Sequence, residues 1–162
     1  MNMASKAKHQ RPAILWVEDN PDVSLLQFIP EQVEKRNAEL LIAQGVMQLR
    51  RILDEPDDVR RINGIILDIM LYGASDLAVF GRENIKLGHG DETGIKLIEN
   101  VFRDKTGEFK ALAEVPILVL TTKPTVSQSD FDKYGKIQVE KKHDRTYDWE
   151  SKVTSWIKER AK

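Results

Sequence analysis

The chain has no cysteine among its 162 residues. Disulfide bonds, thiol chemistry and cysteine-containing zinc sites are therefore excluded, and a reducing compartment is tolerated. The chain also lacks a large charge of one sign, because 25 basic and 26 acidic residues leave a net charge of −1. This balance argues against a nucleic-acid binder that uses its whole surface.

Long apolar runs are missing as well. No stretch approaches the ~20 apolar residues of a membrane-spanning helix, and the opening Met1 to Gln10 is polar, without the apolar core of a secretory signal. We therefore expect a cytoplasmic protein without membrane contacts. Residues 1–10 are expected to form a flexible N-terminus, and residues 11–162 a single domain.

Short apolar runs alternate with amphipathic segments along the chain. This alternation predicts an α/β fold, because buried parallel strands read as short, nearly continuous apolar runs and the helices between them cover both faces. The expected strands are Ala13–Val17, Glu39–Ala43, Ile65–Leu67, Ile117–Leu120 and Ile137–Glu140. The expected helices are Asp22–Asn37, Val46–Leu53, one from Thr93 to about Val101, a short one within Pro124–Tyr134, and Tyr147–Glu159.

Three local features qualify this pattern. Pro30 is expected to kink or divide the first helix. The acidic run Glu55–Asp58 is expected to be a solvated turn. Thr146 is the expected N-cap of the last helix.

Chemically useful side chains follow four of the expected strands directly. They are Glu18 and Asp19 after the first strand, Asp68 after the third, Thr121 after the fourth and Lys141 after the fifth. In open α/β sheets, ligands bind outside the carboxyl ends of the strands. Three carboxylates, a hydroxyl and an ammonium are therefore expected to converge, which suits a divalent metal ion and a phosphoryl group.

Clustered carboxylates need compensation. Two of them at about 4 Å repel by ~4 kcal/mol in an effective dielectric of about 20. Such a cluster raises a carboxyl pKa or recruits a cation. Mg²⁺ fits best, because it is hard, prefers oxygen and keeps several of its waters.

The order of these residues resembles the receiver domain of bacterial two-component response regulators. The matching sequence segments are Val17-Glu18-Asp19-Asn20, Leu67-Asp68-Ile69-Met70-Leu71, Glu92-Thr93-Gly94-Ile95-Lys96-Leu97-Ile98 and Pro116-Ile117-Leu118-Val119-Leu120-Thr121. The resemblance covers roughly Arg11 to Lys162. It implies a flavodoxin-like, doubly wound sheet of five parallel strands in the order 2-1-3-4-5.

The resemblance also implies a metal site. Asp19 and Asp68 would bind Mg²⁺ directly, Glu18 would act through water, and the backbone carbonyl of Met70 would complete the protein ligands.

The same resemblance implies an aspartyl phosphate on Asp68. The carboxylate attacks phosphorus, Thr121 donates a hydrogen bond to the phosphoryl group, and Lys141 offers it a cation. Lys142 is the alternative to Lys141, and Thr122 is the competitor of Thr121. The implied donor is a sensor histidine kinase or a histidine phosphotransfer protein, and an unknown downstream protein receives the signal. Such a phosphorelay component is a signalling domain and not a turnover enzyme.

Two other functions stay open. A pseudo-receiver would use the same fold as a phosphorylation-independent interaction module. This alternative gains support from Tyr72, which stands where the family often has proline, and from Gln138, which stands where it often has an aromatic switch residue. A phosphatase with an aspartyl nucleophile is disfavoured, because haloacid-dehalogenase-like enzymes place an acidic proton donor where this chain has Met70.

The segment between the third strand and third helix is unusually long. Residues 72–91 contain four glycines but also apolar residues, namely Leu77, Val79, Phe80, Ile85 and Leu87. Long loops in compact domains are functional or disordered. We expect part of this insertion to pack on the domain or on a partner, and a lid, a docking segment and a plain surface loop all remain open.

Overall fold

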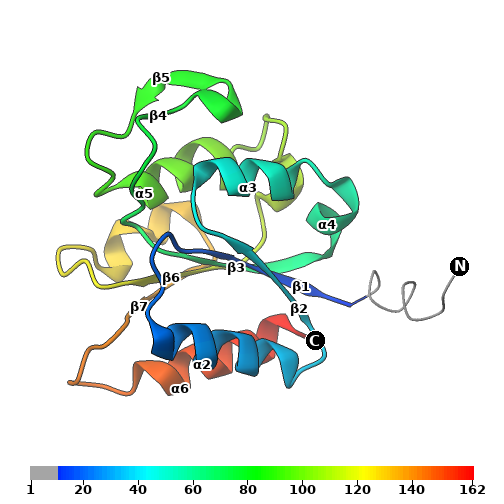
Figure 1. Cartoon of the computed structure of the whole chain (residues 1–162), viewed down its shortest axis with the longest axis vertical. Helices are drawn as coiled ribbons and strands as arrows, with labels where there is room; N and C mark the ends of the chain where they lie inside the picture. Colours follow the sequence, from blue (N-terminus) through cyan, green and yellow to red (C-terminus); the bar gives the residue numbers. More distant parts are fainter. Residues whose placement is uncertain (1–10) are drawn as a thin grey trace, which may run out of the picture.

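The central sheet has five parallel strands in the order β2-β1-β3-β6-β7 (Figure 1). The computed structural model describes residues 11–162, so the expected flexible N-terminus lies outside the described residues. The strands are β1 (Ala13–Val17), β2 (Glu39–Ala43), β3 (Ile62–Leu67), β6 (Ile117–Thr121) and β7 (Ile137–Lys141). Because β6 and β7 are the fourth and fifth strands of this sheet, the predicted 2-1-3-4-5 order is confirmed.

The register aligns the carboxyl ends of the strands. Val17 lies beside Leu67, Leu67 lies beside Val119, and Thr121 lies beside Lys141. The strand interiors are almost completely buried, as expected for a sheet covered on both faces. Residues that follow these strands therefore emerge at one edge of the sheet.

Helices cover both faces of the sheet (Figure 1). One layer consists of α2 (Val23–Glu34) and α6 (Trp149–Arg160). The other contains α3 (Val46–Leu53), α4 (Pro56–Arg61) and α5 (Thr93–Leu97), and α5 continues into a π-helical turn over Ile98–Phe102. Two apolar cores result, one on each side of the sheet. No helix within residues 11–162 is both long and apolar enough to cross a membrane.

Two local predictions are wrong. Pro56 begins helix α4 where a turn was expected, because proline suits the first helical position and Asp57 and Asp58 suit the first turn. Asp148, not Thr146, caps α6, since its carboxylate accepts a hydrogen bond from the Ser151 amide. Helix α2 runs through Pro30 without a break, so of the two expected effects of this proline, a kink or a division, the division does not occur.

The segment before β7 contains no α-helix. Two single 3₁₀ turns, Gln128–Asp130 and Asp132–Tyr134, stand in its place. The Gln128 side chain lies along the outer edge of β7, where its amide nitrogen donates to the Ile137 carbonyl (2.7 Å) and its oxygen accepts from the Val139 amide (3.0 Å). A side chain thus satisfies backbone groups that an edge strand leaves unpaired.

The insertion is an ordered hairpin packed on this domain. Strand β4 (Asp76–Leu77) pairs antiparallel with β5 (Arg82–Lys86). Leu77 is fully buried, and the Phe80 ring meets the Phe109 ring edge-on at 5.9 Å. The Arg50 guanidinium on α3 lies over both rings and forms a two-pronged ion pair with Glu108 at 2.9 Å. The expectation that part of residues 72–91 packs is confirmed.

Gly94 allows α5 to approach the end of β3. Its amide donates to the Ile69 carbonyl at 2.9 Å, and a Cβ at this position would lie 2.4 Å from the Asp68 carbonyl oxygen. Backbone cannot yield as a flexible side chain does. We therefore expect Gly94→Ala to lower the free energy of unfolding by about 2 kcal/mol or more in urea titrations.

Gly45→Ala is the matched control. A Cβ at Gly45 would meet nothing within 4 Å, and this residue has an extended backbone. Its substitution is expected to change stability by less than about 1 kcal/mol. Equal effects of the two substitutions would show that the close approach of Gly94 is unimportant.

Candidate functional site

A cavity of about 220 Å³ opens at the carboxyl ends of β1 and β3. The residues that line it include Glu18, Asp19, Asp68, Met70, Tyr72, Thr122, Lys142 and His143. The sheet register brings these residues together from four separate stretches of the chain. The predicted convergence of acidic side chains at this edge is therefore observed.

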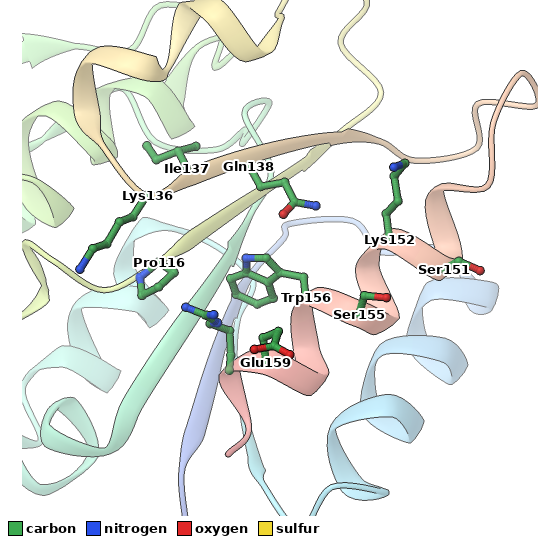
Figure 2. A pocket seen from close by; sticks show the side chains of 10 residues that line it. Pro116, Lys136, Ile137, Gln138, Ser151, Lys152, Ser155, Trp156 and Glu159 are labelled. Carbon is green, nitrogen blue, oxygen red and sulfur yellow. The ribbon is translucent and has the colours of Figure 1, made fainter.

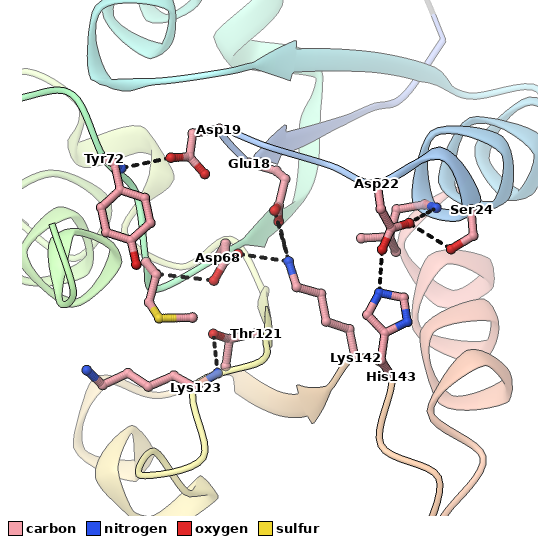
Figure 3. Close-up of polar contacts among 12 residues, drawn as sticks. Glu18, Asp19, Asp22, Ser24, Asp68, Tyr72, Thr121, Lys123, Lys142 and His143 are labelled. Atoms are coloured by element: carbon pink, nitrogen blue, oxygen red, sulfur yellow. Dashed lines mark hydrogen bonds and ion pairs between the residues drawn. The ribbon is translucent and has the colours of Figure 1, made fainter.

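A buried ion pair with three members forms the floor of this cavity (Figure 3). The Lys142 ammonium donates to both carboxylate oxygens of Glu18, at 2.9 and 2.8 Å, and to Asp68 Oδ2 at 2.8 Å. The three side chains are only 7%, 4% and 5% exposed, respectively. One buried cation is thus shared by two buried carboxylates.

The structure places Lys142, the alternative, at the acidic side chains, and it places the ammonium of the expected Lys141 elsewhere. The Lys141 ammonium instead donates to the backbone carbonyls of Lys123 and Val126. Successive side chains of a strand point to opposite faces. Because β7 ends at Lys141, only the next residue turns toward Asp68. The prediction rested on spacing along the chain, and the short turns before β7 do not preserve the spacing of a full helix.

With Lys142 in place of Lys141, the position that corresponds to the aromatic switch residue of receiver domains also moves by one residue. Counted back from Lys142, the position falls on Val139, whereas Gln138 was expected from Lys141. Val139 is half-buried and packs on the core beneath the 3₁₀ turns. Neither residue is aromatic, so the departure from the family pattern remains.

Burial and charge act together on Glu18. Desolvation first, and then the negative charge of Asp68, raise the pKa of Glu18 to about 8 despite the opposing effect of Lys142. Burial lowers the pKa of Lys142, but Asp68 and Glu18 outweigh it, so the net direction is upward. One ammonium cannot neutralise two carboxylates, and Glu18 therefore retains a proton to unusually high pH.

Asp19 and Tyr72 lie at the rim of the cavity. The Tyr72 amide donates to Asp19 Oδ2 at 2.9 Å, which fixes this carboxylate beside the entrance to the insertion. The Met70 amide donates to Asp68 Oδ1 at 3.2 Å, so both oxygens of Asp68 have partners. The Tyr72 side chain is about half exposed and forms part of the wall.

Thr121, the expected hydrogen-bond donor to a phosphoryl group, and its neighbour Thr122 lie in different surroundings. Thr121 is completely buried, and its hydroxyl accepts a hydrogen bond from the Lys123 amide at 3.1 Å. Thr122, not Thr121, is among the residues that line the cavity. The sequence already placed Thr122 next to the expected hydroxyl, but the apolar run before Thr121 favoured the latter.

His143 is a further residue at the rim that the sequence left out. Its Nε2 lies 2.5 Å from Asp22 Oδ2, and its ring contacts the Trp149 ring edge-on at 5.4 Å. Asp22 also caps α2. His143 thus links the chain just after β7 to the start of α2. Its position directly after Lys142 is the only signal in the sequence that could have found it.

The donor set fits Mg²⁺ in its chemistry. Glu18, Asp19 and Asp68 offer hard oxygen ligands within one cavity, as this ion prefers. Within residues 11–162, however, no group of three or more carboxylate or imidazole side chains is arranged as the ligands of a metal ion. The Lys142 ammonium lies between Glu18 and Asp68, so a bound cation would compete with it.

Comparison with solved structures identifies the fold. A response regulator receiver protein from Pseudomonas putida matches with a TM-score of 0.59 and 21% identity, over 92% of this chain and 97% of its own. A CheY-like receiver domain from Methanospirillum hungatei JF-1 matches with a TM-score of 0.54 and 18% identity, over 93% of this chain and 97% of its own. Chemotaxis protein CheY4 from Vibrio cholerae matches with a TM-score of 0.55 and 16% identity, over 91% of this chain and 98% of its own. No protein-family model and no curated protein sequence matches. The chain has the fold of response regulator receiver domains, as the resemblance implied.

The raised pKa of Glu18 predicts a pH-dependent stability. Its folded pKa near 8 exceeds its ordinary value of 4.5, so the folded protein binds more protons between these values. The contribution is complete below about pH 4.5 and is lost as the pH rises through 8. We expect the free energy of unfolding in metal-free buffer to fall by on the order of 1–3 kcal/mol over this window.

Urea titrations of Glu18→Gln check this prediction, because the variant should lack the decline. Glu83→Gln, which alters an exposed carboxyl on the hairpin, is the control and should retain it. Parallel pH profiles of wild type and Glu18→Gln would contradict the assignment to Glu18.

Proposed function

We propose that this chain is a phosphoacceptor receiver of a two-component phosphorelay. It takes a phosphoryl group from the phosphohistidine of a sensor histidine kinase or histidine phosphotransfer protein onto Asp68, and it signals by binding another protein. The observation that carries this proposal is the buried contact of Lys142 with Asp68 at the carboxyl edge of a receiver-like sheet.

The chain supplies the nucleophile and two polar groups for the transfer. An Asp68 carboxylate oxygen forms a bond to phosphorus while the bond from phosphorus to the imidazole nitrogen breaks. The imidazole leaves with the electron pair and takes up a proton. Such transfer needs mainly positioning and charge stabilisation. The Lys142 ammonium supplies a positive charge to the phosphoryl oxygens, and the hydroxyl of Thr121 or Thr122 supplies a hydrogen bond.

Mg²⁺ would be held by Asp19, Asp68, Glu18 through water, and the Met70 carbonyl. When bound, it would neutralise negative charge on the phosphoryl group. Lys142 has to give up contacts with carboxylate oxygens before it can contact a phosphoryl oxygen. Its three hydrogen bonds therefore oppose the reaction until another positive charge stabilises Glu18 and Asp68.

A pseudo-receiver is the second candidate. Lys142 already compensates part of the charge of Glu18 and Asp68, so the site can be stable without a metal ion or a phosphoryl group. The non-aromatic Val139 and Gln138 also speak against the usual relay of the family. In this reading the fold presents a constant surface to its partner.

Intact-protein mass distinguishes these two functions. After incubation with Mg²⁺ and acetyl phosphate, the wild type is expected to gain one phosphoryl group, and Asp68→Asn none, because the amide is not a nucleophile. EDTA should abolish the gain. No gain with acetyl phosphate, phosphoramidate or a phosphorylated kinase domain would favour the pseudo-receiver.

The two adjacent lysines provide a matched pair. Lys142→Gln should slow phosphorylation by roughly 10–100-fold, because it removes the cation at Asp68. Lys141→Gln should leave the rate within about twofold, since among residues 11–162 that ammonium donates hydrogen bonds only to backbone carbonyls. Rates of phosphorylation followed by mass, with unfolding curves of both variants, check this. A larger loss in Lys141→Gln would return the role to Lys141.

A further inference from the structure

A second concave site lies at the opposite end of the sheet from Asp68. It is a groove of about 740 Å³ between the starts of β6 and β7 and the side of α6 (Figure 2). Its lining consists of Pro116, Lys136, Ile137, Gln138, Ser151, Lys152, Ser155, Trp156, Glu159 and Arg160. The volume is within the range of about 300–1,000 Å³ that ligand sites occupy.

The groove has an apolar floor whose depth depends on a glycine. Trp156 and Ile137 are only 7% and 8% exposed, respectively, and Pro116 lies beside them. A Cβ at Gly64 would lie 2.6 Å from Trp156 Cη2 and 2.9 Å from Arg160 Cγ. The absence of a side chain at Gly64 thus lets Trp156 and Arg160 approach the sheet.

The walls carry an excess of positive charge. The side chains of Lys152 and Arg160 form no salt bridge or hydrogen bond with the described residues, although the charge of Lys152 acts on Asp148, and Arg160 Nε is buried without a hydrogen-bond partner. Among the described residues, the Lys136 ammonium pairs with Glu114 alone, at 3.6 Å, and both side chains are well exposed. Glu159 is the one acidic side chain of the lining, and it already pairs with Lys162 at 3.3 Å.

The remaining polar groups also favour a ligand rich in acceptors. The indole N–H of Trp156 has no acceptor among the described residues, and Figure 2 shows this nitrogen on the side of the ring that faces Gln138. Ser155 adds a hydroxyl donor to the same wall. An occupant with carboxylates and one apolar side chain would satisfy both the charges and the floor.

We propose that this groove binds an acidic peptide segment of a partner protein. An apolar side chain of the peptide packs on Trp156 and Ile137, and its carboxylates meet Lys152 and Arg160. Charge complementarity supports this occupant. A second copy of the chain fits less well, because the acidic run on α4 is already engaged by ion pairs of Asp57 with Arg60 and of Asp58 with Arg61. That the partner is a signalling target rests on the proposed function.

Fluorescence anisotropy with model peptides tests the groove directly. The probe is a fluorescein-labelled peptide of alternating Glu and Leu, and the control probe is the same peptide with Lys for Glu. Wild type should bind the acidic probe in preference, more weakly at high salt. Lys152→Gln/Arg160→Gln should bind it roughly tenfold more weakly, since two charged contacts are lost.

Two further variants keep the test decisive. Lys158→Gln removes an exposed cation of α6 that does not line the groove, and it should bind like wild type. Lys152→Gln alone alters no packed side chain, so its weaker binding cannot come from misfolding. Equal binding of the two probes, equal loss in Lys158→Gln, or undiminished binding by the double variant would overturn the proposal.

Sedimentation of the same samples addresses the second copy. Self-association that disappears in the double variant would assign the groove to another molecule of this chain and would overturn the peptide proposal. All binding is measured without Mg²⁺ and phosphodonor. If Asp68 is not phosphorylated, only the proposed function is contradicted. If the acidic probe does not bind preferentially, only the proposal for the groove is contradicted.

Discussion

The buried ammonium of Lys142 is the interaction on which the functional edge of this molecule depends. It joins three strand ends, because its carboxylate partners follow β1 and β3 while it follows β7. Removing one member of a buried ion pair leaves an uncompensated charge, which costs more than the intact pair contributes. The position of β7 at the edge of the sheet is therefore linked to the chemistry of Glu18 and Asp68.

The two edges of β7 are satisfied in different ways. Its inner edge pairs with β6, and its outer edge is covered by Gln128 and by Tyr147, whose hydroxyl contacts the Lys141 backbone. The 3₁₀ turns bring Gln128 to this position. The Val126 carbonyl, which lies just before the first of these turns, binds Lys141 together with the Lys123 carbonyl. The short connection between β6 and β7 thus covers the outer edge of β7 and binds the Lys141 ammonium, which a longer helix would do by packing. It thereby fixes the directions in which Lys141 and Lys142 point.

Much of the fold followed from local patterns. The runs from Ala13 to Val17 and from Ile65 to Leu67 are strands because apolar side chains are buried on both faces, and the acidic residues after them meet because the strands are parallel. The distinction between Lys141 and Lys142 did not follow. A shift of one residue reverses the face of a side chain, and composition does not reveal such a shift.

Other differences have long-range causes. The hairpin at 72–91 packs through contacts of Phe80 with Phe109 and Arg50, which are distant in the sequence, and no local pattern encodes them. The cap of α6 is a choice between Thr146 and Asp148, two residues that both suit the position. Thr146 instead donates through its hydroxyl and amide to Asp144, and this turn leaves Asp148 at the start of the helix.

Lys142 also defines how the two ends of the sheet could be coupled. A ligand shifts an equilibrium only through different affinities for its two states. A phosphoryl group on Asp68 would offer Lys142 new acceptors and weaken its hold on Glu18, and the next residue, His143, is joined to Asp22 and Trp149. Trp149 begins α6, and α6 forms one wall of the groove with Trp156 and Arg160. This chain of contacts is continuous, but continuity alone does not transmit a signal. Under the proposed function, the Lys142 side chain would be the element with two arrangements, so coupling between the site and the groove requires that its release changes the position of α6.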